Sequence, residues 1–203
     1  MNIEGSFKNL YKKMDATSKT RFYASRRLKL HAKASTYTVV FISLALIFVS
    51  LLQAYDLGVN IHSKYTSLVQ VFAAIAVLVY SLLIDKNEYA ALSEKMYSCA
   101  SKLGELKQRM HPYKESGDAT EEKYNEFQKE YWSVLELYET HSSNDFSADN
   151  LRARLDMPED YGITGRKKIE TILDIYRMHV LNFISYPLAI IPLLWSIKWL
   201  WLG

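Results

Sequence analysis

Residues 34–55 read ASTYTVVFISLALIFVSLLQAY, without a single Asp, Glu, Lys or Arg. A second charge-free run, YTSLVQVFAAIAVLVYSLLI, covers residues 65–84. Each run has the roughly 20 residues that a helix needs to cross the hydrocarbon core of a bilayer. The link DLGVNIHSK contains Gly58 and Asn60, which favour a turn. The sequence therefore predicts a two-span transmembrane hairpin over residues 34–84. A soluble buried hairpin, the alternative, would need apolar partners on all sides that the polar remainder does not supply.

A third apolar run, VLNFISYPLAIIPLLWSI, covers residues 180–197 and continues as KWLWLG. Three tryptophans cluster near its end, as aromatic residues do at a membrane interface: Trp195, Trp199 and Trp201. Pro187 and Pro192 each remove a backbone donor and should bend a helix. We expect residues 180–202 to form a third membrane-inserting helix that spans the bilayer, with a re-entrant or interfacial helix as the alternative.

The distribution of positive charge predicts the orientation. Residues 1–33 contain nine Lys and Arg, whereas the link between the spans contains only Lys64. Positively charged loops stay in the cytoplasm. We therefore expect a multi-pass protein of the inner (cell) membrane with a cytoplasmic N-terminus. The basic segment should also lie against anionic lipid headgroups, and the net charge of +3 is too mild to predict direct nucleic-acid binding.

The region after the second span has the spacing of a cytoplasmic helical hairpin. One seam follows steps of 4 and 3: Leu92, Met96, Cys99, Leu103, Leu106 and Met110. No breaker separates this seam from the second span, so we expect one continuous helix to about residue 110. After a turn at Pro112 and Gly117, a helix capped by Asp118 or Thr120 carries an aromatic seam. That seam comprises Tyr124, Phe127, Tyr131, Val134 and Tyr138.

The remaining cytoplasmic residues predict a short helix near 147–155 and a final helix from Thr164. The fold class is thus an all-α integral membrane protein with four parts. These are a basic cytoplasmic N-terminal helix (1–33), the two-span hairpin (34–84), a cytoplasmic helical region (85–163), and a helix leading into the third membrane segment (164–203). With one cysteine, five dispersed histidines and no phosphate-binding motif, we expect no enzyme, no cofactor and no metal site.

Polar residues inside the two spans are the candidate functional positions. They follow helical spacing on each span: Thr36, Ser43, Ser50 and Gln53, then Ser67, Gln70 and Ser81. Polar groups within a membrane face protein or water rather than lipid. One interpretation is helix–helix packing through small and hydroxyl residues. The other is a water-filled pore, which two helices cannot enclose alone and which therefore requires a homo-oligomer.

The whole layout resembles the SLATT family of two-transmembrane effector domains from prokaryotic conflict systems. The runs RFYASRRLKLHAKAS before the first span and DKNEYAALSEKMYSCASKLGELKQR after the second carry the resemblance. It is nearest to the branch found beside reverse transcriptase genes in antiphage loci. The resemblance implies a pore that kills or arrests an infected cell (abortive infection) when a partner protein signals. A non-pore membrane anchor or scaffold for a cytoplasmic partner is the rival interpretation. Family members have two spans, so the third segment is a departure.

Overall fold

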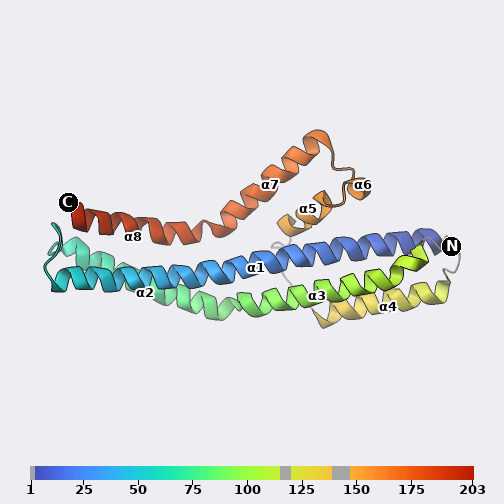
Figure 1. The fold of residues 1–203 in the computed structure, drawn as a ribbon, viewed down its shortest axis with the longest axis horizontal. Helices are drawn as coiled ribbons and strands as arrows, with labels where there is room; N and C mark the ends of the chain where they lie inside the picture. Colours follow the sequence, from blue (N-terminus) through green and yellow to red (C-terminus); the bar gives the residue numbers. More distant parts are fainter. Residues whose placement is uncertain (1–2, 115–119, 139–146) are drawn as a thin grey trace. The chain divides into compact units, whose positions relative to one another are not determined.

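The structure, a computed structural model, describes residues 3–114, 120–138 and 147–203, and these ranges are helical apart from short connections (Figure 1). The helices are α1 (Ile3–Ala54), α2 (Lys64–Asn87), α3 (Tyr89–Met110), the 3-10 turn η1 (His111–Lys114), α4 (Glu121–Leu137), α5 (Ser147–Leu155), α6 (Pro158–Tyr161), α7 (Gly165–Phe183) and α8 (Ser185–Leu202). The predicted turn residue Gly117 and the alternative cap Asp118 lie outside the described residues.

The chain divides into two compact units, each assembled from separate segments. The body unit comprises Met1–Leu28 and Ala90–His179, and the membrane unit comprises Lys29–Tyr89 and Val180–Gly203. The helices α1 and α7 contribute residues to both units. The division into four consecutive parts stays a prediction.

The core of the body unit is formed by the first half of α1 together with α3 and α4, which run alongside it in Figure 1. The two predicted seams meet there, since Cys99, Leu103 and Phe127 all belong to one buried cluster. Thr120 caps α4, and its side chain accepts a hydrogen bond from the Lys123 backbone N–H. The predicted helical hairpin and the short helix at 147–155 are confirmed.

The N-terminal basic segment has a packing role that its charges conceal. Its apolar positions Phe7, Leu10 and Met14 lie in the same buried cluster as α3 and α4. One of its basic residues, Arg27, is also buried. One face of this segment therefore belongs to the core, and contact of the segment with lipid headgroups stays a prediction.

The expected continuous helix from the second span into the cytoplasm is interrupted. Glu88 adopts a left-handed conformation (φ 42°, ψ 38°) between the end of α2 and the start of α3. A residue with that conformation cannot continue a right-handed helix. The prediction of a single helix to Met110 is thus wrong at this one residue, two positions before Ala90, where the chain enters the body unit again.

The C-terminal segment is likewise two helices, with Ile184 between α7 and α8. Pro187 falls in the first turn of α8, where its missing N–H would have had no helical partner. Only Pro192 lies inside the helix. A helix boundary at Ile184 thus precedes Pro187, and the bend expected at Pro192 stays a prediction.

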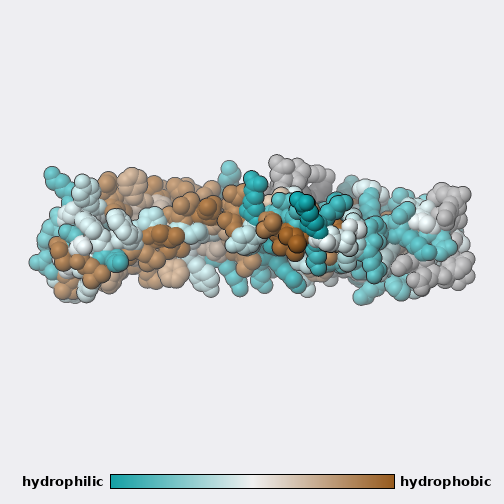
Figure 2. Space-filling model, turned by 90° about the horizontal axis from the view of Figure 1, so that it is seen from above, coloured by the Kyte–Doolittle hydropathy of each residue, from teal (hydrophilic) through white to brown (hydrophobic). Residues whose placement is uncertain are grey.

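Among the described residues, three helices are long and apolar enough to cross a membrane: those containing the two predicted spans, and α8. The 18 residues of α8 cover about 27 Å at 1.5 Å per residue, close to the thickness of a hydrocarbon core. The membrane unit exposes large apolar side chains such as Phe41, Phe72 and Leu194. Figure 2 shows the corresponding hydrophobic surface gathered over α8 and the elements of its unit. A surface of this kind suits lipid and not water.

Candidate membrane-embedded site

The interior of the membrane unit is apolar where its three helices meet. Ile42 of α1, Ala73 of α2 and Leu193 of α8 form one buried cluster. A second cluster, nearer the hairpin link, joins Val49 and Leu200. The third apolar run is thus packed against the hairpin through apolar side chains.

The predicted polar positions lie mostly on the outside of this unit. Thr36, Ser50, Ser67 and Ser81 are exposed, whereas Ser43, Gln53 and Gln70 are partly buried. The hydroxyls of Thr36 and Ser50 donate to carbonyls one turn earlier in α1, those of Ala32 and Leu46, both at 2.9 Å. Their role in packing or in a pore stays a prediction, because it depends on what covers this surface.

Two of the seven positions are brought together. The Gln70 side-chain amide donates to the Gln53 side-chain oxygen at 2.9 Å, which links α2 to α1. The Gln53 amide in turn donates to the Ile61 carbonyl at 3.5 Å. This pair ties the two spans together next to the link between them.

The structure also identifies buried polar residues that the sequence interpretation missed. Ser35, Thr38 and Thr66 are 3%, 1% and 0% exposed. Each hydroxyl donates to a nearby carbonyl, those of His31, Ala34 and Asn60 respectively. A signal for the first two was present, since α1 has a seam with steps of 3 and 4: Ser35, Thr38, Ile42, Ala45, Val49 and Leu52. The predicted stripe begins one residue later, which turns it away from the packed face.

The link between the spans caps the end of α8. The backbone N–H groups of Val59 and Asn60 donate to the Leu200 carbonyl at 3.1 and 3.4 Å. The Asn60 side-chain amide donates to the Trp199 carbonyl at 3.1 Å. The Leu200 carbonyl lies in the last turn of α8, where carbonyls lack a partner within the helix, so the bonds from the link satisfy a group that would otherwise be costly in an apolar setting; the Trp199 carbonyl also accepts from the Gly203 N–H at 3.1 Å. The C-terminus of α8 therefore lies at the same end of the membrane unit as the hairpin link.

Gly58 makes this close approach possible. Its φ of +119° is accessible to glycine, and a Cβ there would lie 2.7 Å from the Leu200 carbonyl oxygen. We expect Gly58→Ala to destabilise the link by about 1–3 kcal/mol through strain and lost hydrogen bonds. Gly162→Ala is the control, because its φ is also positive but nothing lies within 4 Å of the added Cβ. Thermal melting of the detergent-solubilised protein measures the effect of each variant. Equal decreases in melting temperature would show that the link does not depend on this contact.

At the opposite end of the membrane unit, the side chain of His31 is buried in an aromatic cluster. Its ring stacks on Phe183 with centroids 4.1 Å apart and on Tyr89 at 5.3 Å. Its Nδ1 is 3.0 Å from the Tyr186 hydroxyl. The Tyr80 hydroxyl donates to the Ser185 carbonyl at 2.7 Å, which holds the start of α8 to α2. The membrane unit is thus fastened at both ends of α8.

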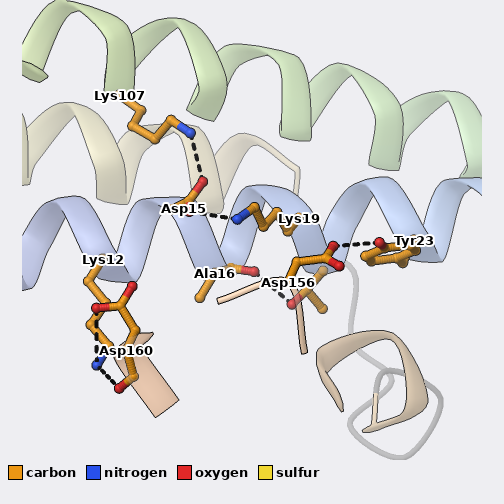
Figure 3. Close-up of polar contacts among 9 residues, drawn as sticks. Lys12, Asp15, Ala16, Lys19, Tyr23, Lys107, Asp156 and Asp160 are labelled. Atoms are coloured by element: carbon orange, nitrogen blue, oxygen red, sulfur yellow. Dashed lines mark hydrogen bonds and ion pairs between the residues drawn. The ribbon is translucent and has the colours of Figure 1, made fainter. Parts of the chain in front are cut away.

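In the body unit, ion pairs attach neighbouring elements to α1 (Figure 3). Asp15 lies between two lysines, with Lys107 at 2.7 Å and Lys19 at 3.0 Å. Burial alone would raise the pKa of Asp15, but hydrogen bonds from Lys107 and Lys19 lower it below its ordinary value. Lys12 donates to the Asp160 carbonyl at 2.6 Å and lies 4.7 Å from the Tyr161 ring centroid. Charged contacts therefore join α1 to α3 and to the α6 segment.

A buried ion pair attaches the α5 segment to α1. Arg27 donates to an Asp149 carboxylate oxygen at 2.9 Å, and the two side chains are 7% and 0% exposed. The Tyr23 hydroxyl donates to Asp156 at 2.5 Å, which raises the pKa of Tyr23. Burial, with the charge of Arg152, lowers the pKa of nearby His179 and favours its neutral form.

Among the described residues, no group of three or more His, Cys, Asp or Glu side chains is arranged to hold a metal ion. Burial raises the pKa of the Cys99 thiol, which disfavours the reactive thiolate. The absence of an enzymatic activity stays a prediction.

Comparison with known families finds a match over most of the chain. The family described as SMODS and SLOG-associating 2TM effector domain family 5 matches residues 3–197, nearly the whole chain. No curated protein and no solved structure matches the chain. The match includes both spans of the hairpin, the body unit and most of α8. The chain therefore belongs to the SLATT family of membrane effector domains, as its family 5.

Proposed function

We propose that the chain is the membrane effector of an antiphage defence system that acts by abortive infection. Copies assemble in the inner membrane, stay closed at rest, and permeabilise it when a partner protein from the same locus acts on the body unit. The chain resembles the family branch found beside reverse transcriptase genes, and this resemblance suggests a reverse transcriptase as the partner. Membership of an effector-domain family with transmembrane helices supports a membrane effector role.

One observation supports permeabilisation between copies in particular. The three-helix interior is apolar, while the hydroxyls of Ser50, Ser67 and Ser81 lie on the outer surface of the unit. Polar groups in a membrane face protein or water. Any water path must therefore run between copies, and these exposed positions are the residues of the two spans best suited to line it.

A non-pore anchor or scaffold is the second candidate. The tight closure of α8 at both ends, by the link and by the His31 cluster, would suit a rigid anchor equally well. The two candidates differ in whether copies assemble through the exposed positions Ser50, Ser67 and Ser81, and in whether ions cross the membrane.

Assembly can be tested by cross-linking in native membranes. In a Cys99→Ala background, Ser50→Cys should form disulfide-linked dimers on oxidation, because it is exposed on the proposed interface. Val49→Cys is the neighbouring control and should not, because Val49 is only 2% exposed within one chain. Absence of dimers at Ser50, and also at Ser67 and Ser81, would contradict assembly through this face.

For orientation, we propose a cytoplasmic N-terminus, an external hairpin link and a third crossing by α8. A reporter active only outside the cytoplasm should be silent before Met1 and active after Gly203, since the link and the end of α8 are hydrogen-bonded to one another. Fusions at both ends leave the chain intact. Silence at both ends would show that α8 does not cross, and activity at the N-terminus alone would reverse the orientation.

A further inference from the structure

The helix α7 carries an apolar face that the rest of the body unit leaves uncovered. Its members recur at helical spacing, on one side of the helix: Ile169, Ile172, Leu173, Tyr176 and Val180. All five are exposed, from 41% at Val180 to 67% at Tyr176. By contrast, Ile175, on another side of the helix, is buried, and Met178 accepts a weak hydrogen bond from Ser147 of α5. The packed side of α7 is therefore distinct from its apolar face.

Basic residues of α7 lie beside its apolar face. By helical spacing, Arg166 and Arg177 flank the apolar face on one side and Lys168 flanks it on the other. Asp174 falls on the far side of the helix, and Glu170 lies between that side and Arg166, with which it pairs at 3.0 Å. An apolar face bordered by basic residues, with Asp174 on the far side, is the pattern of a helix that lies in a membrane interface.

The chain itself brings this helix to a bilayer. Only Ile184 separates α7 from α8, the third helix apolar enough to cross a membrane. The exposed part of the apolar face ends at Val180, within one turn of that junction, and Phe183 on the same side of the helix stacks on His31. A helix tethered so closely to an inserted helix meets lipid at a high effective concentration.

We propose that α7 is a membrane-surface helix that binds the anionic headgroups of the leaflet from which α8 starts. Its apolar face enters the boundary between headgroups and acyl chains, while Arg166, Lys168 and Arg177 contact lipid phosphates. Ser147 of the α5 segment contacts Met178 on another side of α7, so docking on lipid would also restrict the position of α5. The surface would then connect lipid composition to the body unit.

The test places a polarity-sensitive fluorophore on the full chain in vesicles, in a Cys99→Ala background. One probe is attached at Leu173→Cys on the apolar face, and the control at Asp174→Cys, the next residue, which is exposed on the far side. Vesicles contain phosphatidylcholine alone or with phosphatidylglycerol. With phosphatidylglycerol, the Leu173 probe should be blue-shifted and quenched severalfold more by lipid-borne nitroxide than the Asp174 probe. Equal lipid quenching in both compositions, or none in either, would overturn the proposal.

A pair of adjacent lysines tests the charge contribution. Lys168→Gln should weaken docking on anionic vesicles about fivefold, the usual effect of one basic residue near such a surface. Lys167→Gln, which lies opposite the apolar face, should leave it unchanged. If the Leu173 probe is shielded from water but not quenched by lipid, protein covers the face and the proposal is wrong.

Discussion

Replacing Asp149 by Ala should destabilise the body unit by about 3–5 kcal/mol, because it leaves the buried guanidinium of Arg27 without its carboxylate partner. Both side chains are almost fully removed from water, so solvent cannot screen the Arg27 charge that remains in the variant. The α5 segment should detach from α1 first. Denaturant unfolding of the detergent-solubilised protein, followed by helical circular dichroism, measures the loss.

Two further variants make this prediction specific. Asp156→Ala removes an exposed carboxylate that accepts from Tyr23, and it should cost about 1 kcal/mol or less. The double variant Arg27→Met with Asp149→Leu replaces both buried charges by apolar groups and should recover most of the stability. If Asp149→Ala costs no more than Asp156→Ala, the ion pair does not hold α5 to α1.

Leu103→Ala should destabilise the three-helix core by about 2–5 kcal/mol, because Leu103 is fully buried where α1, α3 and α4 meet. The cost combines lost apolar burial with the cavity that remains. Insertion of the membrane unit should be unaffected, since its helices form separate clusters. Limited proteolysis should therefore cleave the body unit faster, while the amount of protein in the membrane fraction stays constant.

The matched control for this variant is Leu137→Ala in α4. Leu137 is 68% exposed, so the same truncation should change stability by no more than about 0.5 kcal/mol. Equal proteolysis of the two variants would show that the Leu/Met seam of α3 is not a packed core.

Periodicity in the sequence was sufficient for most of the helices and for the part of the body-unit core that α3 and α4 contribute. The run after Ser147 predicted α5 with its correct bounds, and the steps of 4 and 3 through Leu103 predicted the buried side of α3. The break at Glu88 could not be predicted, because nothing in an Asp-Lys-Asn-Glu sequence excludes a helix. Its left-handed conformation is a tertiary feature.

The candidate site was harder to predict, for a physical reason. In an apolar helix, almost every position is hydrophobic, so the packed face and the lipid face have similar composition. A polar residue in such a helix therefore does not by itself indicate which face is packed. Ser50 is exposed, while the adjacent Val49 is buried against α8. The packed seam is marked by small and branched residues, and only the third helix reveals which side it occupies.

Periodicity also cannot predict contacts between segments that are distant in the sequence. The N-terminal charges predicted orientation, but the same helix contributes Phe7 to a core with α3 and α4. The cap that the hairpin link provides for Leu200 joins residues about 140 positions apart, and no local pattern encodes it.

Membrane potential in living cells tests the central claim most directly. Cells expressing the chain with its neighbouring genes are challenged with a phage that triggers the system, and a potential-sensitive dye is read against the amount of protein in the membrane fraction. We predict that the inner membrane depolarises after infection, in proportion to the inserted protein, and remains polarised before it. If cells that hold the protein in the membrane keep their potential throughout a triggering infection, the permeabilising effector is contradicted and the chain acts as an anchor.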